Sequence, residues 1–212
     1  IKMVRLKKLM KKIGIIIQAR TNSSRLKGKI FKKLDNKTLI EWVVSRVKKS
    51  RADYIVLATS RKKDDKRLKI IFDNEKIEFF SKNEKNVLER FYKTAAKFKL
   101  DAIVRVCADN PFVDFQEINI LIDTYKKNKI SKDYYFNHKN FKNFTYADGF
   151  GAELLTFKTL KKIYINSKSS FDKEHVTSYI WNNLENFNVT PCQTKVNKNY
   201  HHITLDINNI ND

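Results

Sequence analysis

The sequence predicts an α/β fold built on a largely parallel sheet. Short apolar runs rich in Ile and Val alternate with segments in which apolar residues recur at helical spacing, and this alternation is typical of βαβ units. A chain of 212 residues has the length of one such domain, and no Pro-, Gly- or Ser-rich linker divides it. We therefore expect an N-terminal extension over residues 1–12 and a single domain over residues 13–212.

The individual elements follow from local patterns along the chain. The apolar run at 13–17 predicts a buried strand, and the segment 39–50 repeats its apolar residues on one helix face and ends in cations, as the helix dipole favours. Asn86 is placed to cap another helix, and Asp114 with Glu117 in the capping-box position predicts one more. The remaining expected elements are strands at 54–60 and 101–106, short strands and a long loop on the rim of a site over 131–155, helices around 157–166 and 173–183, and a strand ending in Asp206.

The charge of the chain is strongly positive. Its 44 Lys and Arg residues against 23 Asp and Glu residues give a formal charge of +21, which suits a nucleic acid, an anionic substrate or an anionic membrane surface. The basic residues are mostly lysines spread along the chain among many Asn and Ile residues, as the codon bias of an AT-rich genome would give. The charge alone therefore selects none of these partners.

The cysteine content and the hydropathy bear on the cellular compartment and on membrane insertion. Cys107 and Cys192 are too few for a disulfide framework, and no Cys/His cluster has the spacing of a zinc site, so a reducing compartment is expected. No apolar run has the length of a bilayer span, and the opening segment lacks the apolar core of a secretory signal. We expect a cytoplasmic protein without membrane insertion.

Four segments at expected strand ends carry side chains suited to a nucleotide. Ligands of open α/β sheets bind beyond the carboxyl ends of the strands. The loop Arg20–Lys29 offers cations and hydroxyls for a polyphosphate, although its sequence SRLKGK is not a Walker loop, and Thr59 with Ser60 ends another strand. Asp109 and Asp206 are lone carboxylates of the kind that Mg²⁺ accepts while it bridges phosphate oxygens. Together these segments predict a site for a metal and a nucleoside triphosphate.

The stretch IIIQARTNSSRLKGK at 15–29 resembles the opening signature of the cytidylyltransferases that make CMP-activated sugars. The likeness is greatest to the spore coat polysaccharide type, which is related to the acylneuraminate cytidylyltransferases. It continues in order through EWVVSRVKKS, IVLATS, NVLERFYKTA, VRVCADNPFVD, DGFGAELLTF, DKEHVTSYI and ITLDINNIND. The resemblance covers the chain from Ile13 to its last residue and implies a three-layer αβα nucleotidyltransferase domain, of the nucleotide-diphospho-sugar transferase type with a mostly parallel mixed sheet, that uses CTP and Mg²⁺.

The resemblance also implies roles for individual residues. Arg20 and Lys29 would act on the departing pyrophosphate, and Asp109 and Asp206 would hold the metal. Residues implied to bind the nucleotide are Ala19, Arg20, Ser23, Arg25, Lys29, Thr59, Ser81, Asn83, Arg90 and Asp109. Residues implied to face the acceptor are Asp148, Glu153, Glu174 and His175.

Structural alternatives stand beside these roles. The two metal-site aspartates could instead cap a turn or a helix. Arg25 could brace its loop through a salt bridge, Arg90 could be a surface cation, and His175 could be a hydrogen-bonded structural residue. Gly151 stands where many relatives carry an acid, so the identity of the acceptor does not follow from the resemblance.

The resulting hypothesis is a Mg²⁺-dependent cytidylyltransferase of the CMP-sugar synthetase type. CTP and a sugar acceptor, expected to be an acidic keto sugar, would give a CMP-sugar and pyrophosphate for surface polysaccharide or glycan synthesis. A homodimer stays open, and no nucleic-acid partner is expected. The alternatives are a nucleotidyltransferase with another base or a phosphorylated acceptor, a regulatory domain that binds a nucleotide without turnover, and an RNA-binding protein that stacks bases on the aromatic stretch Tyr134–Tyr146.

Overall fold

Seven strands form one mixed sheet in the order β5-β4-β1-β6-β8-β7-β9. The computed structural model describes residues 11–19, 28–60, 65–73, 77–81, 86–128, 132–192 and 202–207. The strands of this sheet are β1 (Ile13–Gln18), β4 (Tyr54–Thr59), β5 (Glu78–Ser81), β6 (Ala102–Cys107), β7 (Tyr134–Phe136), β8 (Glu153–Thr156) and β9 (Val189–Pro191). A separate hairpin pairs β2 (Lys33–Leu34) with β3 (Lys37–Thr38).

The strand directions bring the segments predicted to bind the nucleotide and the metal to one edge of the sheet. β8 runs antiparallel to both of its neighbours, whereas every other pair in the sheet is parallel. The carboxyl ends of β5, β4, β1 and β6 therefore lie at the same edge. Because β8 runs the other way, its first residue, Glu153, lies at that edge too. The predicted α/β fold with a mostly parallel mixed sheet is confirmed.

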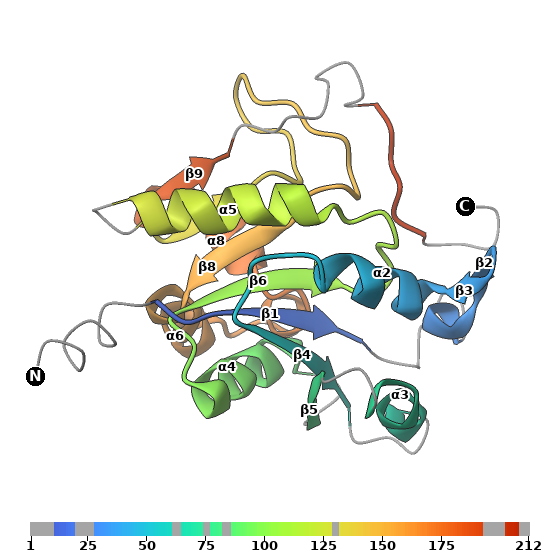
Figure 1. The fold of residues 1–212 in the computed structure, drawn as a ribbon. Helices are drawn as coiled ribbons and strands as arrows, with labels where there is room; N and C mark the ends of the chain where they lie inside the picture. Colours follow the sequence, from blue (N-terminus) through green and yellow to red (C-terminus); the bar gives the residue numbers. More distant parts are fainter. Residues whose placement is uncertain are drawn as a thin grey trace, which may run out of the picture.

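Helices cover both faces of the sheet, which gives the three layers seen in Figure 1. The central strand β1 is buried on both sides, so side chains that alternate along it belong to two different cores: Ile15 and Ile17 to one, Ile16 to the other. One core includes residues from α2 (Leu39–Val47), α3 (Asp65–Phe72) and α5 (Phe115–Lys127). The other includes residues from α4 (Val87–Phe98), α6 (Phe157–Asn166) and α8 (Ser178–Asn182).

The helix starts follow the capping signals, with one exception. Asn86 Oδ1 accepts the backbone N–H of Glu89 at 2.9 Å, and Asp114 Oδ1 accepts that of Gln116 at 2.6 Å, so both predicted caps are confirmed. The capping box predicted with Glu117 forms only in part: Asp114 Oδ1 also accepts the Glu117 N–H at 3.3 Å, but the Asp114 N–H donates to the backbone oxygen of Phe150 at 2.9 Å. The Glu117 carboxylate accepts a hydrogen bond from Asn137 Nδ2 at 2.9 Å.

The helix predicted over 173–183 is wrong as one continuous element. It is divided into α7 (Ser170–Glu174) and α8 (Ser178–Asn182). The backbone leaves helical geometry at His175, which has φ −103° and ψ 87°. Val176 and Thr177 turn into the core at this point, so tertiary burial overrides the helical pattern of the sequence.

Two further expectations about the second half need correction. The strand predicted to end in Asp206 is not part of the sheet: within 202–207, Thr204 makes only an isolated parallel bridge with Asp148. The stretch beginning at Tyr134 was expected at the rim, but β7 lies between β8 and β9, and its side chains are fully buried. Its aromatic residues pack in the two cores because both faces of the sheet are covered.

The last structural elements are short. They are the 3-10 helices η1 (Lys29–Phe31) and η3 (Leu184–Asn186). Across the part of the chain that the structure describes, no helix combines the length and the apolar character needed to cross a membrane.

Candidate active site

Lys29 joins two distant parts of the chain. Its ammonium donates a hydrogen bond to Asp109 Oδ2 at 2.6 Å and another to the backbone oxygen of Ile207 at 2.8 Å. Lys29 begins η1 directly after Gly28, whose φ of 66° is a left-handed conformation that glycine adopts without steric cost. The Lys29 side chain is only 8% exposed, so its positive charge is held among protein oxygens.

The segment 202–207 is tied to the loop that carries Asp148. The Asp148 N–H donates to the backbone oxygen of Ile203 at 3.1 Å, and the Leu205 N–H donates back to that of Asp148 at 3.1 Å. Gly149 lies so close that a Cβ at this position would come within 2.8 Å of Leu205 Cβ. The loop and the segment therefore fit together as neighbouring extended backbones.

The same segment also contacts the end of β6. The Ile207 N–H donates to the backbone oxygen of Asp109 at 3.2 Å, which holds the residue after Asp206 beside the residue that follows β6. In Figure 1 the segment, drawn in red, lies on the side of the molecule toward which the arrowheads of β1 and β6 point. These contacts assemble what we call the carboxylate cluster: Asp109, Asp148 and Asp206, with Lys29.

The surroundings of Asp206 make the charged form of its carboxylate less stable. Burial, followed by the negative charges of Asp148 and Asp109, raises the pKa of Asp206 to about 7. The cations Lys29 and Arg105 act in the opposite direction but do not cancel the rise. The cluster is therefore short of positive charge, and a further cation would be stabilised there.

The residues present fit Mg²⁺ completed by a substrate. Mg²⁺ usually takes one or two protein carboxylates and fills its other positions with water and phosphate oxygens. Among the described residues, no group of three or more His, Cys, Asp or Glu side chains could hold a metal by itself. The ammonium of Lys29 already lies between a carboxylate and a carbonyl oxygen, so this position accepts a cation. Asp109 and Asp206 stay the predicted ligands.

The residues predicted to bind the nucleotide lie along the neighbouring strands. Ala19 follows β1, Thr59 ends β4, and the Ser81 hydroxyl at the end of β5 donates to the backbone oxygen of Ser60 at 2.5 Å. Within the described residues, the buried Thr59 Oγ1 has no hydrogen-bond partner. Arg90 on α4 is 0% exposed, so the alternative of a surface cation is wrong. The predicted residues that lie outside the described part of the chain are Arg20, Ser23, Arg25 and Asn83.

Glu153, predicted to face the acceptor, lies in a buried ionic network. It stands opposite Arg105 in the pair β6–β8, and its Oε1 accepts a hydrogen bond from Arg105 Nη1 while its Oε2 accepts one from the Tyr134 hydroxyl. Burial alone would raise the pKa of Glu153. Arg105, His138 and hydrogen bonds from Tyr134 and Thr177 outweigh burial and bring this pKa down to about 2. We call these five residues the buried ionic network.

Glu174 and His175, the other residues predicted for the acceptor, lie at the end of α7, which packs against α4. The His175 ring is exposed and lies 4.4 Å from the Phe171 ring, measured between centroids. Thr177 follows two residues later and hydrogen-bonds Glu153. The turn that carries Glu174 and His175 is thus tied to the buried ionic network, and their contact with an acceptor stays a prediction.

Sequence reasoning missed four members of that network: Arg105, Tyr134, His138 and Thr177. A signal for Arg105 was present, because an arginine in the otherwise apolar strand AIVRVC requires an acidic partner once the strand is buried. Glu153, at the start of the apolar strand ELLT, is the complementary signal. No local pattern indicated Tyr134 or His138.

Gly151 has a packing role between β7 and β8. A Cβ at this position would come within 2.0 Å of the backbone oxygen of Asn137. The Asn137 amide is fixed there, since its Nδ2 donates to the Glu117 carboxylate and its Oδ1 accepts the Ala152 N–H at 3.0 Å. No side chain fits at residue 151 in this conformation.

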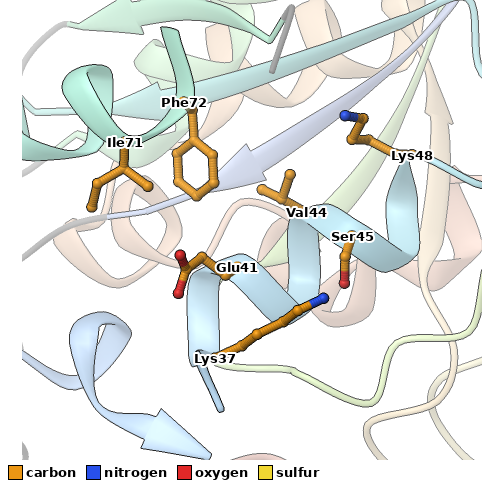
Figure 2. Close-up of a pocket in the computed structure, with 7 residues that line it drawn as sticks. All are labelled: Lys37, Glu41, Val44, Ser45, Lys48, Ile71 and Phe72. Carbon is orange, nitrogen blue, oxygen red and sulfur yellow. The ribbon is translucent and has the colours of Figure 1, made fainter. Parts of the chain in front are cut away.

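A pocket of about 320 Å³ lies between α2 and α3. Figure 2 shows apolar side chains such as Val44 and Phe72 beside polar ones from α2. None of its lining residues belongs to the carboxylate cluster or the buried ionic network. Its acid, Glu41, is already used by the cap of α2, where it accepts the Thr38 N–H at 2.7 Å. The pocket therefore adds nothing to the site at the strand edge.

Known proteins match most of the chain. The sequence model of a family described as cytidylyltransferase matches residues 14–207. An uncharacterized protein of Methanocaldococcus jannaschii is 37% identical over 181 residues, which cover 85% of this chain and 71% of that protein. The spore coat polysaccharide biosynthesis protein SpsF of Bacillus subtilis is 32% identical over 179 residues, 82% of this chain and 71% of SpsF. A 3-deoxy-manno-octulosonate cytidylyltransferase of Fusobacterium nucleatum is 39% identical over 137 residues, 61% of this chain and only 52% of that enzyme.

Solved structures share the fold. A cytidylyltransferase from Leptospira borgpetersenii superposes with a TM-score of 0.86 at 25% identity, covering 95% of this chain and 83% of the other. The CMP:2-keto-3-deoxy-manno-octonic acid synthetase, solved with CTP, gives a TM-score of 0.66 at 12% identity over 87% and 90% of the two chains. The fold is that of the nucleotidyltransferases, with its charged residues at the carboxyl edge of the sheet. Within that class, the chain belongs to the cytidylyltransferase family.

Proposed function

We propose that this protein transfers CMP from CTP to an acidic keto sugar and releases pyrophosphate, with Mg²⁺ as its metal. The carboxylate cluster carries the proposal, because it places Asp109, Asp206 and Lys29 at the edge where a nucleotide binds in an open α/β sheet. A relative named for 3-deoxy-manno-octulosonate supports an acidic keto sugar. SpsF, named for spore coat polysaccharide, supports a product used in surface polysaccharide synthesis.

The proposed reaction is an in-line displacement at the α-phosphate. The acceptor hydroxyl oxygen forms a bond to phosphorus and gives up its proton to water, while the bond to the leaving pyrophosphate breaks. Lys29 would exchange its contacts with Asp109 and Ile207 for phosphate oxygens and, with Arg20, stabilise the departing charge. Mg²⁺ held by Asp109 and Asp206 would supply charge neutralisation at the attacked and leaving oxygens. Positioning and electrostatics therefore supply most of the acceleration.

The test combines binding with turnover. CTP with Mg²⁺ is expected to raise the melting temperature more than ATP, GTP or UTP does, since a ligand that binds only the folded state stabilises it. Pyrophosphate release is then measured with each nucleotide and a panel of keto sugars, both acidic and neutral. Equal stabilisation by all four nucleotides would remove the preference for cytidine, and release with another nucleotide alone would favour the alternative base.

The alternatives from other classes predict different results. A regulatory domain would bind CTP without releasing pyrophosphate. An RNA-binding protein would bind RNA tightly at physiological salt, whereas binding that reflects composition alone should be weak and fall steeply with salt. The aromatic residues of β7 are fully buried, so they offer no exposed face for base stacking. The expected homodimer and cytoplasmic location stay predictions, which sedimentation and cell fractionation would check.

A further inference from the structure

Arg105 is the member of the buried ionic network that lies next to the carboxylate cluster. Its side chain is 18% exposed, against 3% for Glu153, so the arginine is the partner that reaches the surface. Residue alternation along β6 puts Arg105 and Cys107 on the same face, and Asp109 follows two residues later. Arg105 opposes the rise in the pKa of Asp206, so the guanidinium lies within electrostatic range of the cluster.

The guanidinium of Arg105 has more donors than the protein uses. Arginine carries more N–H donors than any other side chain. Glu153 is its only strong acceptor among the described residues, and the second contact, from Nη2 to Cys107 Sγ at 3.3 Å, is to a weak acceptor. Burial raises the pKa of the Cys107 thiol to about 12, so the sulfur carries no charge that could neutralise the arginine. Arg105 Nε is buried and has no partner within the described part of the chain.

Glu153 receives hydrogen bonds from other donors besides Arg105. Its second carboxylate oxygen accepts the Tyr134 hydroxyl, and Thr177 also hydrogen-bonds this carboxylate. The pair is therefore unequal: the acid is satisfied, while the arginine can still bind an anion. Arginine is suited to this because its planar fork binds carboxylates with two parallel hydrogen bonds.

An acidic keto sugar carries a carboxylate, and binding of the sugar for transfer would place this anion near Arg105. In its ring form, the carbon that bears the attacking hydroxyl also bears the carboxylate. When the hydroxyl is near the α-phosphate, the carboxylate must lie within a few bonds of the reacting atoms, close to Asp109, Asp148 and Asp206. These acids would repel it unless a cation on the acceptor side compensates the charge.

Resting on the function proposed above, we propose that Arg105 binds the carboxylate of the acceptor and so selects acidic keto sugars over neutral ones. Glu153 and Tyr134 act as positioning residues, since they fix one side of the guanidinium and leave its other donors for the substrate. The same geometry would also allow Arg105 to act only as a brace, which holds β6 and β8 together through its ion pair with Glu153. The experiment separates these two roles.

The experiment compares an acid with its neutral analogue. The probes are 3-deoxy-manno-octulosonate and a set of other 2-keto-3-deoxy sugar acids, each with its methyl ester, at saturating CTP and Mg²⁺. For Arg105→Gln, the KM for the acid is expected to rise roughly 10- to 100-fold, the scale of one hydrogen bond to a charged group. The KM for the ester and the KM for CTP should change less than about threefold, within the scatter of an ordinary substitution.

Glu153→Gln is the comparison variant, because it breaks the same ion pair but keeps the cation. It should lose less of the preference for acid over ester than Arg105→Gln does, even though it melts at a lower temperature. Arg51→Gln is the control, because it breaks an exposed ion pair with Asp123 away from the site and should leave the preference unchanged. If Arg105→Gln does not fold, the double variant Arg105→Met/Glu153→Met removes both charges without leaving either unpaired, and it should fold and lose the preference.

Several outcomes would overturn the inference. Equal losses for acid and ester in Arg105→Gln, or retained preference in the Met/Met variant, would leave Arg105 as a brace only. Turnover of neutral sugars but of no acid would overturn the inference while CMP transfer itself survives. Absence of pyrophosphate release from CTP with every sugar, acidic or neutral, would instead reject the proposed function, and the inference with it.

Discussion

Glu153 is buried and Asp206 is half-buried near the same edge of the sheet, yet their surroundings move their pKa values in opposite directions. Burial raises both, but a guanidinium and hydrogen-bond donors lower the pKa of Glu153 to about 2. Neighbouring aspartates add to burial and raise the pKa of Asp206 to about 7. The charge of Glu153 is therefore compensated within the protein, whereas the carboxylate cluster sets three aspartates against the one ammonium of Lys29. This excess of negative charge supports the proposal that a ligand or metal binds at the carboxylate cluster.

The largest expected effect comes from breaking the ion pair between Arg105 and Glu153. Glu153→Gln should lower the free energy of unfolding by about 3–5 kcal/mol, because it leaves Arg105 buried without its counter-charge. Urea denaturation of both proteins measures the difference. Asp206→Asn is the contrasting variant: it removes a charge from an overcrowded cluster and should leave stability unchanged or raise it at neutral pH. A loss of similar size in both variants would contradict the distinction between the two regions.

The second effect is the pH dependence of the same network. Because the pKa of Glu153 is lowered in the folded state, its stabilising contribution is full above its ordinary pKa and is lost as the pH falls from about 4.5 towards 2. A shift of this size corresponds to roughly 3 kcal/mol in total. The difference in stability between the parent protein and Glu153→Gln should shrink as the pH is lowered through this range, followed by urea denaturation at successive pH values. A difference that stays constant would mean that Glu153 does not titrate as described.

The smallest effect in free energy falls on turnover. Asp109→Asn and Asp206→Asn should each lower the rate of pyrophosphate release about 100-fold, equivalent to ~2.7 kcal/mol, while the melting temperature changes little. Asp133→Asn is the matched control, since Asp133 accepts the Asn188 N–H at 2.9 Å and the Thr159 hydroxyl at 3.1 Å in a purely structural role. It should cost about 0.5–2 kcal/mol of stability and leave turnover intact. Early melting with normal turnover in either site variant would remove that residue from the proposed metal site.

Local patterns in the sequence predicted the parts of the fold that local physics controls. The apolar run of β1 and the caps of α4 and α5 are set by neighbouring residues, and they were found. The break between α7 and α8 was not, because the burial of Val176 and Thr177 is decided by residues far away in the sequence. The sequence placed β7 at the rim of the site, because the burial of this strand is also decided by residues far away in the sequence.

The residues of the candidate site also divide into those that local sequence patterns predicted and those that depend on contacts between distant segments. Lys29, Asp109 and Asp206 were singled out because each lies beyond an expected strand, and the structure brings their segments together. Asp148 was assigned to the acceptor, yet its nearness to Asp206 depends on a pairing between two loops that no local pattern indicates. Arg105 was missed because its importance lies in which donors remain unused, and that is visible only once its partners are placed.

The contact between Lys29 and Ile207, which are separated by 178 positions, also bears on the order in which the molecule forms. The parallel ladder of β1, β4 and β6 is complete without residues 202–207, which are held by a handful of backbone hydrogen bonds. Contacts between such distant segments close the longest loops and so carry the largest entropic cost. A chain with a formed sheet but an undocked segment 202–207 is thus folded yet lacks Asp206. We expect docking of this segment to be a later and weaker cooperative step than folding of the sheet, and under the proposed function turnover depends on it.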